Sequence, residues 1–267
     1  MSFSINSVSP SISGNSATTS AASFEKLSSG SRINQAGDDA AGLAVSQRMT
    51  SQLGGFDAAI RNSGDAISSI QVTDGALESL SKNIGRIQEL ALQSSNGVLS
   101  DTDRQAINAE AGQLVDDSNK ILENTNFNGK SLLSSDADLN VQLESPSATL
   151  TVKGKDLASE FESLGFADID LSTQVGASSA ISVLKDASEA TIERSSELGA
   201  SSNRIESSIE NLASASNNTA EARSRIADAD FAKVTADLAA SQIKDQVQIS
   251  VQAQANSNRE GILKLLS

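Results

Sequence analysis

The sequence predicts a mostly α-helical fold, in which long helices from both chain ends pair in a coiled-coil or helical-bundle arrangement around a small mid-chain β-hairpin region. Three observations predict this class. The 267 residues include only 2 prolines, so long stretches lack the strongest helix breaker. Large apolar residues recur at helical spacing in both outer parts of the chain. A short central segment instead alternates with a period of two.

In the N-terminal part of the chain, the sequence predicts the start of a first helix and, further on, a long amphipathic helix. Ser9 and Pro10 suit an N-cap and a first helical position. Residues 56–93 predict a single long helix, because their apolar residues recur at steps of three, four and seven. This stripe consists of Ile60, Ile67, Ile70, Leu77, Leu80, Ile84, Ile87 and Ala91.

A second helix is predicted directly after this one. Asn96 and Gly97 mark a break, and Ser100 with Asp103 then forms the pattern of a capping box. The apolar spacing that follows continues to Asn124. We expect the two helices to form an antiparallel hairpin.

The middle of the chain changes its period. Residues 139–143 and 149–153 alternate around Ser145, Pro146 and Ser147, which predicts a β-hairpin. Residues 154–175 show no sustained period, and we interpret them as an irregular connector with a short helix at 157–164.

The C-terminal side returns to helical spacing. Residues 180–212 predict a helix, Asn217 and Asn218 a break, and the residues beyond them a last helix that reaches the C-terminus. The first stripe consists of Ile181, Leu184, Ile192, Leu198, Ile205, Ile209 and Leu212. The second consists of Phe231, Val234, Leu238, Ile243, Val247, Val251 and Ala255, with a five-residue step that shifts its phase.

Composition excludes most kinds of enzyme. The chain has no Cys, His, Trp or Tyr, which removes most nucleophiles, proton shuttles and the ligands of zinc or iron–sulfur sites. We therefore expect no catalytic activity, no cofactor and no metal. A net charge of −14 argues against a nucleic-acid partner.

Membrane insertion and a standard secretion signal are also not expected. No apolar run reaches membrane-spanning length. Residues 1–20 lack the basic and apolar regions of a Sec-type signal peptide, so export would need a different, uncleaved signal.

The helices are poor in large side chains. Aromatic residues make up 3% of the chain, so any core is built from Ile, Leu, Val and Ala. Ser- and Ala-rich helices are marginal in water without packing partners. The sequence therefore predicts a homo-oligomer whose subunits complete each other's terminal helices.

Three groups of short motifs resemble bacterial flagellin. The first comprises residues 27–34 (LSSGSRIN) and 38–44 (DDAAGLA). The second comprises residues 86–94 (RIQELALQS) and 125–129 (TNFNG). The third comprises residues 222–226 (ARSRI), 228–232 (DADFA), 253–256 (AQAN) and 262–266 (ILKLL). Together they cover roughly the first half and the last third of the chain in matching order, which is more specific than any single motif.

The resemblance implies a structural subunit that polymerises into the flagellar filament used for swimming. It implies an inner coiled-coil domain from residues 1–45 and 220–267 and an outer helical domain from residues 46–134 and 176–219. The variable region at 135–175 would be minimal. The subunit would be exported unfolded by the flagellar type III apparatus, with an export chaperone on its C-terminal region, and would assemble under a filament cap outside the cell.

The resemblance also implies a receptor contact. Arg86, Leu90 and Glu110 occupy positions that contact Toll-like receptor 5 in similar flagellins. Arg86 and Leu90 are one helical turn apart on one face. We interpret the same surface mainly as a subunit contact of the filament, which a receptor would meet in the monomer.

Charged residues near the predicted helix joins are candidate assembly contacts. Asp38 and Asp39 suggest helix caps or salt bridges, with Arg32 and Arg48 as candidate counter-charges. Arg223 and Arg225, close to Asp228 and Asp230, suggest pairs between helices or subunits. The full set of candidates is Arg32, Asn34, Asp38, Asp39, Arg223, Arg225, Asp228 and Phe231.

Three other functions remain open at this stage. A hook–filament junction protein shares flagellin-like ends but does not grow long filaments. A secreted enzyme on a flagellin scaffold would need a catalytic insert, which the short middle and missing His disfavour. A soluble coiled-coil binding module would not need matching motifs at both ends.

Overall fold

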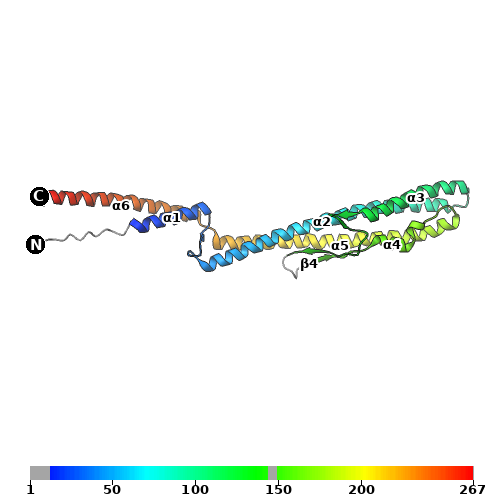
Figure 1. Cartoon of the computed structure of the whole chain (residues 1–267), viewed down its shortest axis with the longest axis horizontal. Coiled ribbons are helices and arrows are strands. Elements are labelled where there is room, and N and C mark those ends of the chain that lie inside the picture. The colour runs from blue at the N-terminus through cyan, green and yellow to red at the C-terminus, as the bar shows by residue number, and fades with distance from the viewer. Residues whose placement is uncertain (1–12, 144–148, 267) are drawn as a thin grey trace. The chain divides into compact units, whose positions relative to one another are not determined.

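A computed structural model describes residues 13–143 and 149–266 of the chain, and it confirms a mostly helical fold (Figure 1). The chain divides into two compact units, unit 1 (Met1–Leu53 with Asn217–Ser267) and unit 2 (Gly54–Ser216). Its long helices are α1 (Ser13–Ser29), α2 (Ala40–Ser94), α3 (Asp101–Asn124), α5 (Gln174–Ala227) and α6 (Phe231–Leu266). The division into inner, outer and variable domains at the predicted boundaries stays a prediction.

Unit 2 holds the apolar core of the described residues. Its helices α2, α3 and α5 lie side by side (Figure 1), and a chain of buried apolar side chains runs between them. Most of the stripe predicted on residues 56–93 is buried: Ile70, Leu77, Leu80, Ile84, Ile87 and Ala91. Ile60 and Ile67 are partly covered. The helical period therefore identified the packed face correctly.

The predicted start of the second helix is confirmed in detail. The Ser100 hydroxyl accepts the backbone N–H of Asp103, and the Asp103 carboxylate accepts the backbone N–H of Ser100. These reciprocal bonds satisfy two N–H groups that a helix start leaves unpaired. The Ser100 bonds also lower the pKa of Asp103. The helix α3 then runs antiparallel to α2, since Asn83 contacts Ser118 and Arg86 contacts Glu110.

The predicted β-hairpin is present on unit 2. Strands β3 (Leu139–Gln142) and β4 (Thr149–Val152) pair antiparallel, with Leu139 opposite Val152. Val141, Leu150 and Val152 are buried and add to the core. The predicted turn at residues 145–147 lies outside the described residues. The short helix α4 (Leu157–Leu164) has the predicted bounds and is followed by a 3₁₀ turn, η1 (Phe166–Asp168).

A second, smaller hairpin was not predicted. Strands β1 (Asn126–Phe127) and β2 (Lys130–Ser131) are joined by Asn128 and Gly129. Both turn residues have positive φ, 51° and 76°. This two-residue turn matches the Asn-Gly preference of hairpins whose central residues are both left-handed.

Two expectations on the C-terminal side were wrong. Helix α5 continues through Asn217 and Asn218 to Ala227, because Asn is only a moderate helix former and does not break a helix. The break lies instead at residues 228–230. Ile192 is 62% exposed, because Thr191 and Arg194 take the core-facing positions on that turn.

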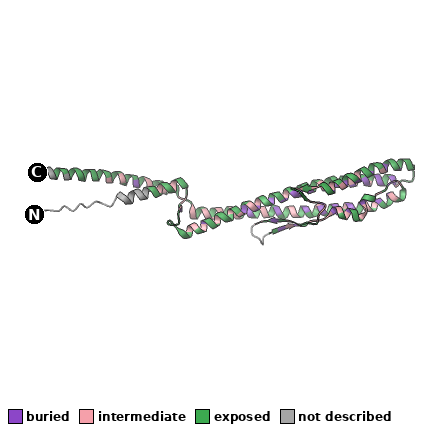
Figure 2. Ribbon diagram, in the orientation of Figure 1, coloured by how far each residue is buried: buried purple, intermediate pink, exposed green. Residues whose placement is uncertain are grey.

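Unit 1 is thin by comparison. Helix α1 packs against α6. Among the described side chains of this unit, Ile33 is the only buried apolar residue. Figure 2 shows the contrast, with buried residues concentrated in unit 2 and exposed ones along α6. The predicted helix start at Ser9 and Pro10 lies outside the described residues.

Candidate assembly surfaces

The first surface lies where α2 and α3 run side by side. The Arg86 guanidinium contacts the Glu110 carboxylate at 2.7 Å and the Glu89 carboxylate at 3.0 Å. Bonds from Glu110 and then Glu89 raise the pKa of Arg86 above its ordinary value. The side chains of Arg86 and Glu110 are about half exposed, 51% and 48%. This ion-pair cluster therefore presents both charges to solvent.

Leu90 does not belong to this surface. It is 2% exposed and lies in the core of unit 2. Its position three residues after Ile87 places it on the buried stripe, whereas Arg86 lies at the edge of that stripe. The burial of Leu90 removes it from the predicted three-residue surface, and a contact made by Arg86 and Glu110 stays a prediction.

The second surface is a clasp in unit 1, where residues 30–32 meet the end of α5. The Arg32 backbone N–H donates to the Ala227 carbonyl at 2.6 Å, and its guanidinium donates to the Ile226 carbonyl at 2.6 Å. Ser31 and Asp228 form an antiparallel bridge. Arg32 thus satisfies carbonyls that a helix C-terminus leaves unpaired, and its charge suits that end of the helix dipole.

The predicted carboxylate caps are partly confirmed. Asp39 caps α2, since its carboxylate accepts the Gly42 N–H at 2.8 Å. A Cβ on Gly42 would come within 2.7 Å of the Ile33 side chain, so glycine suits this first turn. Asp38 accepts the backbone N–H groups of Asn34 and Gln35, which lower its pKa.

The expected counter-charges of these carboxylates were wrong. Arg32 binds the carbonyls of α5, and the Arg48 side chain donates to the Ala44 carbonyl of its own helix. Backbone N–H groups already satisfy the two carboxylates, so no ion pair is needed to hold them.

The remaining predicted contacts lie near the α5–α6 break. The Asp228 carboxylate accepts the Ser224 hydroxyl, and Arg225 pairs with Glu221 on its own helix. Arg223 forms no ion pair with any residue that the structure describes. Phe231, the first residue of α6, is 61% exposed. The expected pairing of these arginines with Asp228 and Asp230 is therefore absent within the described part of this chain.

Helix α6 carries two different faces. Among its described side chains, the buried or partly covered positions recur at alternate steps of four and three, as in a heptad seam against α1: Val234, Leu238, Ser241, Asp245 and Gln248. Ile243, Val247 and Val251 lie one turn apart on the other side of the helix. Their exposed fractions are 65%, 55% and 61%. We call these three residues the free face of α6.

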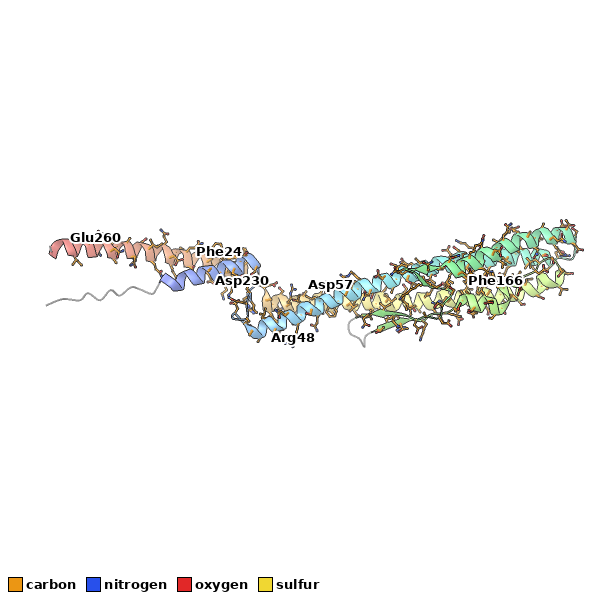
Figure 3. All side chains as sticks on the ribbon, viewed as in Figure 1. Phe24, Arg48, Asp57, Phe166, Asp230 and Glu260 are labelled. Carbon is orange, nitrogen blue, oxygen red and sulfur yellow. The ribbon has the colours of Figure 1, made fainter. Side chains whose placement is uncertain are left out.

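The predicted stripe of the last helix therefore joins two faces. Its five-residue step after Leu238 marks the change from the α1 seam to the free face. Figure 3 shows the two helices of unit 1, with Phe24 labelled on α1 and Asp230 and Glu260 near the two ends of α6. The seam against α1 is mostly polar, while larger apolar side chains stay uncovered.

Sequence reasoning missed two buried arginines in unit 2. Arg104 is 6% exposed and donates to the carbonyls of Ser94, Asn96 and Leu99 at the end of α2. Arg194 is 4% exposed and donates to the Lys153 carbonyl at 2.9 Å. No periodic signal marks either residue, because an arginine in a helical pattern is ordinarily read as solvent-facing.

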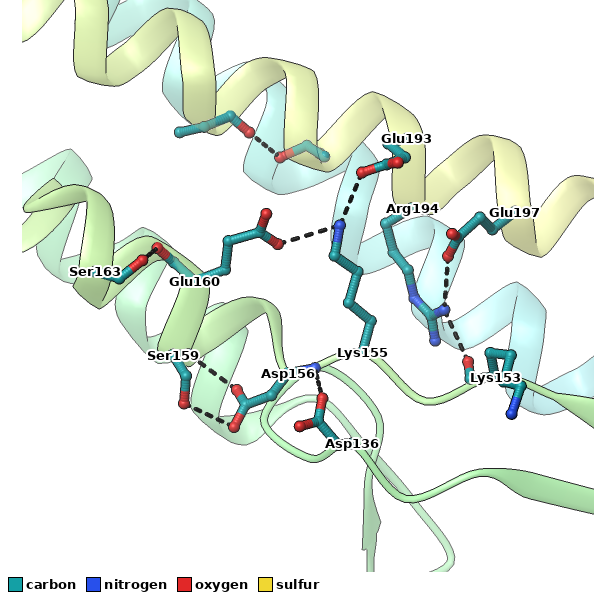
Figure 4. A network of polar contacts seen from close by, with 12 residues as sticks. Asp136, Lys153, Lys155, Asp156, Ser159, Glu160, Ser163, Glu193, Arg194 and Glu197 are labelled. Carbon is teal, nitrogen blue, oxygen red and sulfur yellow. Dashed lines mark hydrogen bonds and ion pairs between the residues drawn. The ribbon is translucent and has the colours of Figure 1, made fainter.

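Arg194 belongs to a polar network that holds the β3–β4 region against α5 (Figure 4). Lys155 bridges Glu193 of α5 at 2.8 Å and Glu160 of α4 at 3.2 Å. The bond from Glu193 is the largest cause that raises the pKa of Lys155. These contacts fix the short middle segment to the helical core.

The described residues contain neither a metal-binding cluster nor a membrane-spanning helix. Within residues 13–143 and 149–266, no acidic cluster is placed to hold a metal ion. In that part of the chain, no helix combines the length and the apolar content that crossing a membrane requires. The distinctive features are surfaces and caps.

Comparison with known proteins identifies the family. The family model described as bacterial flagellin N-terminal helical region matches residues 4–138, and the bacterial flagellin C-terminal helical region matches residues 181–266. The chain belongs to the bacterial flagellin family. The part of this flagellin between the two matches contains the β3–β4 hairpin strands and α4.

Related flagellar proteins are similar in sequence to this flagellin over about nine tenths of the chain. A flagellin of Halalkalibacterium halodurans is 41% identical to this flagellin over 248 residues, covering 91% of this chain and 90% of its own. The flagellar filament 30.7 kDa core protein of Treponema maltophilum is 35% identical over 262 residues, covering 91% of each chain.

Two solved structures are also similar to this flagellin. The Bacillus cereus flagellin crystal structure has a TM-score of 0.51 and 31% identity, covering 57% of this chain and 88% of that one. A putative flagellar hook-associated protein from Vibrio parahaemolyticus has a TM-score of 0.60, covering 72% of this chain and 100% of that one. Its identity of 13% shows a likeness of fold alone.

Proposed function

We propose that this flagellin is a structural subunit that polymerises into the bacterial flagellar filament used for swimming, and that the free face of α6 is one of its subunit contacts. The observation that carries the proposal is the row of Ile243, Val247 and Val251. Each is more than half exposed in a unit whose described side chains include a single buried apolar residue, Ile33. Apolar side chains repeated along one helix face are stabilised when another helix covers them.

The charge of the chain favours this type of contact. A net charge of −14 makes like-charged subunits repel one another at long range. The free face carries no charge, so its burial between subunits requires no charge to be desolvated. Small neighbours on the same side, Ala236 and Ala240, allow a close approach of a second helix.

Seeded polymerisation of the purified flagellin tests the proposal. The double variant Ile243→Asp with Val247→Asp places two carboxylates on the free face, and we expect it to lose filament growth. The matched control, Gln242→Asp with Gln246→Asp, adds the same charge at exposed positions on the flank of the same helix. Filaments from the free-face variant as long as those from the control would contradict the proposal.

The same experiment addresses the alternative of a hook–filament junction protein. A filament subunit adds to seeds repeatedly, so filament length rises with the amount of subunit supplied. A junction protein would stop after a short layer. We propose the filament subunit, which agrees with the filament core protein among the relatives.

We further propose that the subunit is exported unfolded and assembles outside the cell, helped by an export chaperone and a filament cap. The absence of Cys supports this route, because no disulfide has to form or break during export. The thin core of unit 1 supports it as well, since terminal helices that lack partners fold as they assemble. Cell fractionation with and without an intact flagellar export apparatus tests the route; secretion that is unchanged without the apparatus would contradict it.

Receptor contact by the monomer is a second proposal, which the exposed cluster of Arg86 and Glu110 supports. We propose that this pair contacts Toll-like receptor 5, and that Arg86→Ala lowers signalling in a receptor reporter assay. Lys120→Ala is the matched control, since it removes a comparably exposed cation of α3 that pairs with Asp117. Equal signalling by the Arg86 and Lys120 variants would contradict the proposal. A catalytic activity is not part of the proposed function.

A further inference from the structure

The break between α5 and α6 is unusual in its sequence. Residues 222–236 contain neither Gly nor Pro, and Ala, Arg and Lys make up about half of them. Such a segment favours helix continuation on local propensity alone. Yet the helix stops at Ala227 and starts again at Phe231. The cause of the break must therefore lie in contacts made by these residues.

The clasp residues supply those contacts. In an uninterrupted helix the Ala229 N–H would bond the Arg225 carbonyl, while the carbonyls of Ile226 and Ala227 would accept from Asp230 and Phe231. In the structure the Ala229 N–H donates to the Gly30 carbonyl at 3.0 Å. Arg32 fills the carbonyls of Ile226 and Ala227 with its guanidinium and its backbone N–H.

Residues 30–32 thus supply partners for three backbone groups whose helical hydrogen bonds the break removes. Gly30 ends α1 with a positive φ of 68°, which turns the chain so that residues 30–32 lie along the end of α5. On the other side of the break, the Asp230 carboxylate accepts the Lys233 N–H at 3.1 Å and caps the new helix. The Ala229 N–H and the carbonyls of Ile226 and Ala227 therefore each have two possible partners, one in residues 30–32 and one within a continuous helix.

We infer that residues 228–230 are a conditional helix break that residues 30–32 control. When residues 30–32 are docked, α5 and α6 are separate helices. When they leave, the Ala229 N–H and the carbonyls of Ile226 and Ala227 pair within one helix that runs continuously through the break. Docking of residues 30–32 and the start of a separate helix at Phe231 are then coupled, so that one changes whenever the other does.

The lack of cysteines allows a clean test in the full-length chain. Arg32→Pro removes both the guanidinium and the backbone N–H that hold the clasp. Ala36→Pro is the matched control, because Ala36 is the second residue of the turn closed by the Asp38 N–H and the Gln35 carbonyl. Proline is favoured at that turn position. Ser31→Cys with Asp228→Cys locks the docked state when oxidised, since the two residues are bridge partners.

The readout is the set of NMR Cα secondary shifts at residues 228–230, with residues 233–250 as an internal monitor of α6. We expect helical shifts at 228–230 in the Arg32→Pro variant, and non-helical shifts in the Ala36→Pro variant and the oxidised double-cysteine variant. Asp230→Ala, which removes the cap and leaves the clasp donors in place, should move the shifts part of the way toward helix.

Two outcomes would overturn the inference. One is non-helical shifts at 228–230 in both the Arg32→Pro and Asp230→Ala variants, whether or not residues 233–250 stay helical. The other is helical shifts at 228–230 in the oxidised double-cysteine variant. Neither depends on filament assembly, so the switch is tested separately from the proposed function.

Discussion

Unit 2 and unit 1 are both built from long helices, but they bury very different amounts of apolar side chain. Unit 2 contains a continuous core that includes Leu80, Ile87 and Ile205, each fully buried. Among its described residues unit 1 buries Ile33 and leaves Ile243, Val247 and Val251 exposed. Because most helical stability in proteins comes from packing, unit 2 has a core that can stabilise its helices, whereas the described part of unit 1 has almost none. Similar helices in one chain thus differ in how far they are packed, which agrees with the proposed assembly role of unit 1.

An Ile→Ala substitution in each unit should give the largest difference in the free energy of unfolding. Ile205→Ala removes a fully buried side chain and should lower the free energy of unfolding of the monomer by about 3 kcal/mol. Ile243→Ala removes a side chain that is 65% exposed, and should change the free energy of unfolding by less than about 0.5 kcal/mol. Urea unfolding of both monomers measures this. Seeded growth should be weakened by Ile243→Ala, and similar unfolding losses for the two variants would remove the contrast.

A smaller difference in the free energy of unfolding is expected between Arg104, a buried helix cap, and Lys82, an exposed charge. Arg104→Ala leaves carbonyls of Ser94, Asn96 and Leu99 without their donor, and should lower the free energy of unfolding by about 2–3 kcal/mol. Lys82→Ala breaks an exposed pair with Glu78 and should leave the free energy of unfolding nearly unchanged. A loss for Arg104→Ala no larger than that for Lys82→Ala would show that the cap is dispensable.

Acid should weaken the two units through different carboxylates. Bonds from Lys153 and then the Gly154 N–H lower the pKa of Asp138 in unit 2 below its ordinary value of 3.8. A lowered pKa in the folded state means that the native form binds fewer protons than the unfolded form in this range. The stability it gives is complete above the unfolded pKa and is lost as pH falls through the folded pKa.

Substitution separates these contributions. Asp138→Asn should flatten the loss of unit 2 stability as the pH falls below the ordinary carboxyl pKa of 3.8. Asp38→Asn removes the corresponding carboxylate of unit 1 and should leave that loss in unit 2 unchanged. Urea unfolding at several pH values, followed by a probe in each unit, measures both slopes. The effect should be the smallest of the three, since both carboxylates lie at the surface.

Much of the fold follows from local patterns in the sequence. The capping box at Ser100 and Asp103, the bounds of α4 and the pairing of β3 with β4 were predictable, because neighbouring residues determine each of them. The break at residues 228–230 was not, because it depends on Gly30 and Arg32, almost two hundred residues away. Local composition instead favoured a break at Asn217 and Asn218, where the helix continues.

The candidate surfaces were predictable only in part. Arg86 and Glu110 were named as residues of one surface, and they form an ion pair between α2 and α3. The burial of Leu90 depends on how wide the packed stripe is, which spacing alone does not give. The free face of α6 was merged with the α1 seam into one stripe, since the sequence does not say which side of a helix α1 covers. Buried arginines such as Arg104 need tertiary contacts to be recognised.

Amide hydrogen exchange on the free monomer and on assembled filaments tests the contrast between the units most directly. The account predicts that residues of the unit 2 core, such as those around Leu80 and Ile205, are protected in both forms. It predicts that α6 around Ile243 to Val251 exchanges rapidly in the monomer and becomes protected only in the filament. Strong protection of α6 in the free monomer, equal to that of unit 2, would contradict the account.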